Sequence, residues 1–189
     1  MRLGKDLVDK PIITVSDGRH MGKAKDVYLD RHLQEMTGIY LGREGLFRRK
    51  DNFIPRASVV VFGVDAILVE NAEAITDSKE TTIEGWVRLS DLIGRDVDTP
   101  GGTRLGTIGD VILDTAGRVT GFSLGRVLVD GPIAEQRAIA REVVIDNGNE
   151  DGVMTIDLLK AERVSLPTET EADTSAATDT NNNEGGEEN

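Results

Sequence analysis

An internal repeat constrains the fold of this chain more than any other feature, because a sequence that recurs must form the same unit twice. Glycine, aspartate and aliphatic residues of the first copy return 84 residues later in the same order: Gly22, Asp26, Val27, Leu29 and Asp30 match Gly106, Asp110, Val111, Leu113 and Asp114. Further matches keep this order with shifts of one residue: Thr37, Gly38 and Leu41 match Thr120, Gly121 and Leu124, and Ile54, Arg56 and Val59 match Ile139, Arg141 and Val144. We therefore expect residues 3–70 and 86–165 to form superimposable units, with Val27 and Val111 at the same strand position.

Each copy consists of short β-branched and aliphatic runs that are separated by turn signals. Such runs favour buried strands over helices, and glycine-containing segments such as 16–18 and 100–102 are typical of tight turns. Residues 146–149 separate two apolar runs and predict a hairpin. Residues 132–142 are the one stretch in which we expect a short helix. Many short strands in so small a unit predict an all-β fold of two small barrels, since closure removes exposed strand edges.

Two segments carry a resemblance to a known family. They are Leu92–Val97 and Arg104–Asp114 in the second copy, with Ser16–Gly22 and Lys25–Asp30 as their counterparts in the first. Each copy resembles a PRC-barrel domain, the β-barrel of the cytoplasmic subunit of purple-bacterial photosynthetic reaction centres and of ribosome-maturation factors. The resemblance covers about residues 3–165. It implies protein-contacting modules without known chemistry of their own.

The chain divides into four parts. We expect a first barrel over residues 1–70, a polar linker over 71–85, a second barrel over 86–166 and an acidic disordered tail over 167–189. Units of about 80 residues bury a modest share of their surface, so the two barrels should gain stability by packing together. We expect Trp86 to belong to the core of the second barrel, with an anchor between the barrels as the alternative.

Composition excludes several classes of function. The chain lacks cysteine and has two histidines, His20 and His32, so neither disulfides nor a zinc site of usual spacing is expected. The net charge is −12, and the tail contains seven acids and no base, which leaves 27 acids against 22 bases elsewhere. A mildly acidic body disfavours nonspecific binding to nucleic acid. Because no apolar run spans a membrane and the start has no apolar signal core, we expect a cytoplasmic protein without cofactors.

Three motifs suggest chemistry, and each has a simpler structural interpretation. Asp114-Thr115-Ala116-Gly117 resembles the loop of aspartic proteases, but the matching Asp30 lacks the following hydroxyl residue and glycine, so we expect Asp114 to close a turn. Asn147, Asn149 and Asp151 are spaced as in a calcium loop, yet Leu158 stands where a bidentate glutamate is required, and a hairpin turn is favoured. The glycines of 101–109 fit no phosphate-binding pattern and are assigned to turns and barrel bends.

A basic loop in the first copy is the strongest candidate for a binding site. Four bases and two phenylalanines lie within residues 43–53, whereas the counterpart at 127–132 is not basic. The rings either anchor a partner or turn inward to fill the barrel, with the charges merely solvated. The candidate partner-binding residues are Arg43, Phe47, Arg48, Arg49, Lys50 and Phe53.

The function expected from these patterns is that of a non-catalytic adaptor or assembly factor that binds another protein. RNA-associated or ribosome-associated work through the basic loop is the alternative, because arginines and phenylalanines together suit charge and base stacking. An aspartic-type hydrolase is a more distant alternative. The identity of the partner and the oligomeric state do not follow from the sequence.

Overall fold

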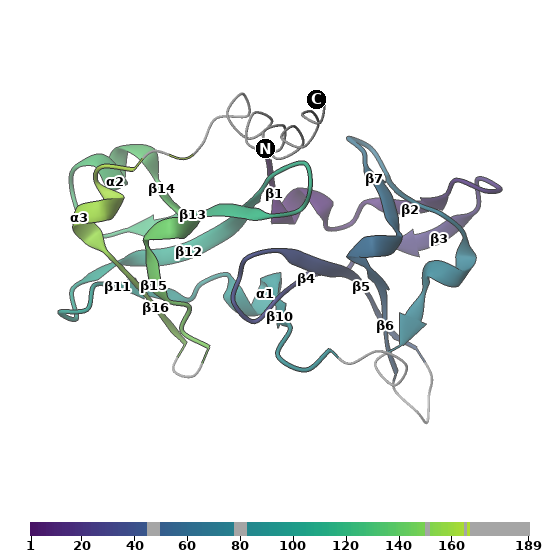
Figure 1. Ribbon diagram of the computed structural model, residues 1–189, viewed down its shortest axis with the longest axis horizontal. Helices are drawn as coiled ribbons and strands as arrows, with labels where there is room; N and C mark the ends of the chain where they lie inside the picture. The colour runs from purple at the N-terminus through teal and green to yellow at the C-terminus, as the bar shows by residue number, and fades with distance from the viewer. Residues whose placement is uncertain (45–49, 78–82, 150–151, 165, 167–189) are drawn as a thin grey trace, which may run out of the picture.

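The computed structural model describes residues 1–44, 50–77, 83–149, 152–164 and 166, and short strands dominate it (Figure 1). The first copy contains β1 (Arg2–Leu3), η1 (Gly4–Leu7), β2 (Pro11–Thr14), β3 (His20–Lys23), β4 (Asp26–Leu29), β5 (Met36–Glu44), β6 (Lys50–Pro55), η2 (Arg56–Ser58), β7 (Val59–Phe62), β8 (Ile67–Val69), η3 (Ala72–Ala74) and β9 (Thr76–Asp77). The second copy contains β10 (Val87–Arg88), α1 (Leu89–Leu92), β11 (Asp96–Asp98), β12 (Arg104–Leu113), β13 (Val119–Val127), α2 (Pro132–Gln136), β14 (Ala138–Ala140), η4 (Arg141–Val143), β15 (Val144–Asp146), β16 (Val153–Ile156) and α3 (Leu158–Ala161).

The two copies place matched residues at matched strand positions. Val27 of β4 pairs with Ile39 of β5, and Val111 of β12 pairs with Phe122 of β13. All four side chains are fully buried. The predicted duplication is confirmed. The hairpin expected around residues 146–149 is also present, as β15 and β16.

The copies differ in how their sheets are divided. In the second copy β12 runs without interruption through one sheet of order β14–β13–β12–β11–β16–β15. In the first copy the matching strand is split into β3 and β4, which belong to separate sheets, β3–β2–β8–β7 and β10–β4–β5–β6–β9. The chain passes from one sheet to the other at Ala24 and Lys25. The Ala24 amide donates a hydrogen bond to the Lys10 carbonyl, and the Lys25 amide donates one to the Tyr40 carbonyl. The predicted helix at 132–142 is present only in its first half, α2, and β14 and η4 follow.

Each copy completes a sheet of the other. β1, at the start of the first copy, pairs with β12, where Arg2 lies opposite Leu113. β10, at the start of the second copy, pairs with β4, where Val87 lies opposite Leu29. The two pairings are equivalent in the repeat, so the copies exchange their first strands reciprocally. A continuous core that includes residues of both copies lies beneath them.

Two buried aspartates fasten the exchanged segments. The Asp110 carboxylate accepts a hydrogen bond from the Lys5 backbone at 3.2 Å, in η1. The Asp26 carboxylate accepts one from the Ser90 hydroxyl at 2.5 Å, in α1. Asp26 and Asp110 are matched positions, so an equivalent hydrogen bond holds the first segment of each copy to the other copy. A carboxylate that accepts backbone or hydroxyl hydrogens satisfies groups that would otherwise be buried unpaired.

The turns between the long strands meet at the same contact. The Met36 amide donates to the Gly117 carbonyl at 2.8 Å, and the Val119 amide donates to the Gln34 carbonyl at 2.7 Å. Arg56 and Arg141, which are matched in the repeat, each donate to a carbonyl of the opposite copy, Ala116 and Leu33 respectively. The expectation that the barrels pack together is confirmed.

β9 lies within the segment predicted as a linker, and it pairs with β6 of the first copy. The four domain boundaries stay a prediction, and residues 167–189 lie outside the described part of the chain. Among the described residues, no helix is long and apolar enough to cross a bilayer.

Reciprocal exchange predicts that the copies stay together after the chain between them is cut. We expect a variant with a protease site in place of residues 79–81 to give two fragments that co-elute in size-exclusion chromatography. Each fragment keeps a strand that is paired in the other, and denaturant should separate them. Fragments that separate without denaturant would contradict the exchange.

Candidate binding groove between the two copies

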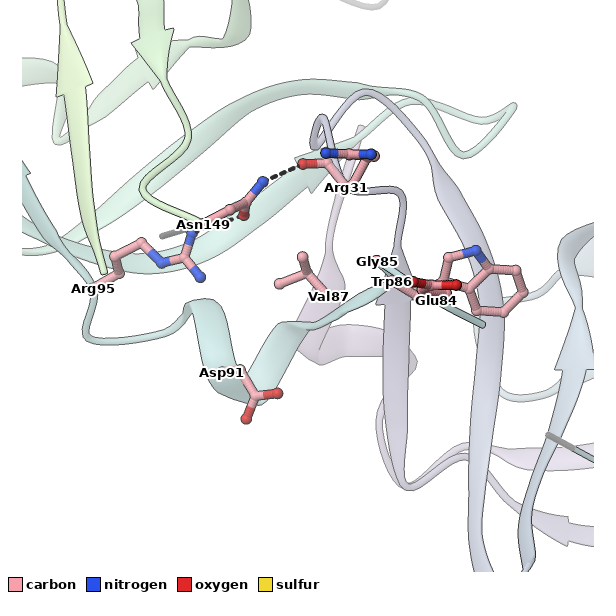
Figure 2. A pocket seen from close by; sticks show the side chains of 8 residues that line it. All are labelled: Arg31, Glu84, Gly85, Trp86, Val87, Asp91, Arg95 and Asn149. Carbon is pink, nitrogen blue, oxygen red and sulfur yellow. Dashed lines mark hydrogen bonds between the residues drawn. The ribbon is translucent and has the colours of Figure 1, made fainter. Parts of the chain in front are cut away.

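An open groove of about 760 Å³ lies where the start of the second copy crosses the first (Figure 2). Its walls come from four segments that are far apart in the sequence: the β4–β5 turn, the chain before and within β10, α1 with the residues after it, and the β15–β16 turn. The lining residues are Arg31, Glu84, Gly85, Trp86, Val87, Asp91, Arg95 and Asn149. The groove therefore exists only because the two copies are docked.

Hydrogen bonds between the copies hold one side of the groove. The Asn149 side-chain amide donates to the Arg31 carbonyl at 2.5 Å, as the dashed line in Figure 2 shows. Within the second copy, Arg95 donates to the Asn147 carbonyl at 2.5 Å and to the Asn149 side-chain oxygen at 3.4 Å. Asn147 and Asn149, part of the calcium-like motif, thus make protein contacts in a hairpin turn.

The groove presents charges of both signs to solvent. Arg31 and Arg95 provide guanidinium groups, and the exposed Glu84 and Asp91 provide carboxylates. Such a lining suits a polar polypeptide segment with both acidic and basic side chains better than an apolar small molecule. Among the described residues, no three histidine, aspartate or glutamate side chains gather as metal ligands would.

Trp86 forms the aromatic wall of the groove by packing on the first copy. Its ring centroid lies 5.5 Å from that of Tyr28 and 5.3 Å from that of Phe53, and the ring planes are inclined. The expectation that Trp86 belongs to the core of the second barrel is wrong. Its indole completes a separate aromatic cluster with Tyr28, Tyr40 and Phe53, because β10 is paired to β4 and carries the preceding residue onto that sheet.

A polar network borders the aromatic cluster. The Arg88 guanidinium lies 4.5 Å above the Tyr40 ring, which suits a cation–π contact. The Tyr40 hydroxyl and the Arg43 guanidinium both donate to Asp51, at 2.9 and 2.8 Å. Burial acts to raise the pKa of Asp51, but the hydrogen bonds from Arg43 and Tyr40 and the charges of Arg43 and Arg88 together outweigh it, and the pKa lies below its usual value. Asp51 therefore keeps its charge and holds the two strands of the hairpin together.

The geometry of both copies agrees with one family. A sequence model of the PRC-barrel domain matches residues 1–75 and again residues 84–162. The chain belongs to the PRC-barrel family. It is an all-β protein with two tandem PRC-barrel domains, as the resemblance implied, and this family is not a known enzyme family. No curated protein matches the chain.

The structure places the predicted partner-binding residues of the first PRC-barrel copy in different surroundings. Arg43 lies on β5 and is about half exposed beside Asp51. Phe53 is fully buried in the aromatic cluster, so its ring takes the inward of the two positions left open by the sequence. Lys50 begins β6. Phe47, Arg48 and Arg49 lie outside the described residues, and the role of this loop in binding stays a prediction.

Asp114 has the structural role that its turn predicts. Its carboxylate accepts hydrogen bonds from the Arg118 backbone and side chain, both at 2.8 Å. The matching Asp30 closes its own turn by accepting from the backbone amides of His32 and Glu35. The glycines at 101–109 also fit the barrel: a Cβ on Gly109 would lie 2.6 Å from the Gly125 nitrogen, so two strands approach too closely for a side chain.

Proposed function

We propose that this PRC-barrel protein is a non-catalytic adaptor or assembly factor that binds another protein in the cytoplasm. The proposal rests on a difference between the copies. β5 and β6 pair as far as Arg43–Asp51 and Glu44–Lys50, whereas β13 and β14 pair only over Gly121–Ser123. Features that folding requires should be present in both copies. A long hairpin in one copy alone therefore supports a role outside folding.

The charge of the hairpin supports an acidic surface as its target. Arg43 and Lys50 stand on its two strands, and Arg48 and Arg49 lie between them in the sequence. These four bases exceed the two acids of the hairpin, Glu44 and Asp51, of which Asp51 pairs with Arg43. Opposite charges at an interface speed encounter and select the partner. The groove between the copies offers a second polar surface to the same partner.

The first test reverses two charges of the hairpin. We expect Arg48→Glu with Arg49→Glu to reduce capture of the native partner from cell extract at least tenfold, while the melting temperature stays nearly unchanged. Affinity capture with quantitative mass spectrometry measures the first effect, and thermal unfolding measures the second. Arg126→Glu with Arg137→Glu, two exposed bases of the second copy, is the matched control. Undiminished capture would remove the hairpin from the contact surface.

RNA-associated work is the second candidate function, and the bases of the same hairpin favour it. The two functions differ in their response to salt and nuclease. Binding through phosphates weakens steeply with salt, because counterions are released. A complex that dissociates on nuclease treatment would support RNA binding, and a complex that survives the treatment would support a protein partner.

A further inference from the structure

The sheet β3–β2–β8–β7 of the first copy has an outer face that is apolar on β2, β8 and β7, whereas β3 places the exposed His20 beside Ile13. Ile13 of β2 lies opposite Leu68 of β8, which lies opposite Val61 of β7, so the three side chains form a row across the sheet. Their neighbours Ile12 and Ile67 are fully buried and point to the core. Because side chains alternate along a strand, the row faces outward. Val61 is 45% exposed.

Further apolar residues enlarge this face, which we call the valine face. It comprises Ile13, Val15, Val60, Val61 and Leu68, of which Val15 and Val60 are 57% and 56% exposed. A bulge between Val59 and Val61 leaves Val60 exposed as well. The sheet stands at the end of the molecule away from the second copy's sheet (Figure 1).

The second copy provides an internal control. Its row at the same positions is Asp98, Thr155 and Asp146, which are cross-strand partners in the same arrangement. The same fold therefore forms with polar and acidic side chains there. The apolar row of the first copy is not a requirement of folding, and clustered exposed apolar side chains mark contact surfaces.

Strand addition is blocked at β7, one of the two edge strands of this sheet. On β7, the Val59 carbonyl accepts from Arg56 and the Phe62 carbonyl accepts from Arg2 at 2.8 Å. Strand addition needs such carbonyls unoccupied. A partner at this side of the sheet therefore does not add a strand at β7.

Charged residues at the two sides of the valine face indicate which molecule binds it. Exposed Lys23 ends β3 on one side, and exposed Asp65 lies in the β7–β8 turn on the other. Both lie at the same end of the strands, because Pro11 pairs with Lys23 and Ile12 pairs with Ile67. A two-fold axis parallel to the strands would bring β3 of one molecule over β7 of another. Lys23 then faces Asp65 of the second molecule, and the symmetry repeats the contact.

We propose that two copies of this chain associate by docking their valine faces, with Lys23 and Asp65 paired across the contact. This surface is distinct from the hairpin and the groove, so the inference goes beyond the proposed function. The valine face lies on three strands of three or four residues, β2, β7 and β8. Its area is therefore smaller than the roughly 800 Å² per partner of a standard interface. The dimer is therefore weak and depends on concentration.

The test replaces the apolar row with the residues of the second copy. In sedimentation velocity, the full chain should show a sedimentation coefficient that rises with concentration. The variant Ile13→Asp, Val61→Asp, Leu68→Thr should stay monomeric over the same range. Val61→Asp alone should raise the dissociation constant at least tenfold, and circular dichroism should report an unchanged fold. Ile145→Asp, at the position that matches Val60, is the control and should leave association unchanged.

A charge exchange tests the symmetry of the contact. Asp65→Lys should weaken association, and Asp65→Lys combined with Lys23→Asp should restore it. The proposal is overturned if the full chain stays monomeric up to about 1 mM, or if the triple variant associates as the wild type does. Association that Asp65→Lys weakens and the double exchange does not restore would also overturn it.

Discussion

Replacement of Phe53 by alanine is expected to lower the free energy of unfolding by about 3–5 kcal/mol. The ring is fully buried and lies edge to face with Tyr28 at 6.1 Å and Trp86 at 5.3 Å, so alanine leaves a cavity that these rings cannot fill. The melting temperature should fall by roughly 10 °C. Chemical denaturation measures the first quantity and calorimetry the second. Val64→Ala, at an 88% exposed position, is the control and should change stability by less than about 0.5 kcal/mol.

The same cluster tests where Trp86 belongs. If Phe53 and Trp86 share one contact, Phe53→Ala and Trp86→Ala should be non-additive, with a coupling of about 0.5–1.5 kcal/mol. If Trp86 belonged to the core of the second barrel, the two losses would add. Additivity within error would therefore contradict the cluster, and a loss below about 1 kcal/mol for Phe53→Ala would contradict the burial.

Replacement of Asp110 by alanine is expected to lower the free energy of unfolding by about 1–3 kcal/mol for each amide that loses its acceptor. Those amides belong to Lys5, at 3.2 Å, and Val111, at 2.8 Å, and both donate to the same carboxylate oxygen. Asp110→Asn is the matched control, because its side-chain oxygen can occupy that position. It should keep most of the stability. Equal losses in the two variants would show that charge, and not the acceptor, matters here.

The stability contributed by Asp110 should also depend on pH. Burial raises the pKa of Asp110, although hydrogen bonds from Val111 and Lys5 act in the opposite direction. The folded protein therefore holds this proton more tightly than the unfolded chain does. The stability that protonation of Asp110 contributes is fully present below the pKa of the unfolded chain, about 3.9. It is lost as the pH rises through the pKa of the folded protein. The stability of wild type relative to Asp110→Asn should fall over that window, and a difference that rises with pH would contradict the assignment.

Local patterns in the sequence were sufficient to predict the two barrels. Matched residues such as Val27 and Val111 recur in order, and the runs around them alternate with glycine-rich turns, so strand positions follow from neighbours in the chain. The hairpin of β15 and β16 was predictable for the same reason. The candidate groove was not, because its walls come from four distant segments. Its one visible signal was Trp86, an isolated large aromatic residue at the join between the copies.

Asp110 and Asp26 illustrate the limit of a repeat as a source of prediction. Their recurrence predicts that they have equivalent roles. It does not predict which copy supplies their partners, because a carboxylate or a strand can form the same hydrogen bonds with a segment of its own copy or of the other copy. The sequence by itself therefore determined the all-β fold, its duplication and the divergence of the basic hairpin. Only the tertiary structure decided that β1 and β10 are exchanged, that Phe53 and Trp86 share a cluster, and that Ile13, Val61 and Leu68 meet on one face. Those choices depend on which distant surfaces bury each other, and burial is a property of the whole docked molecule.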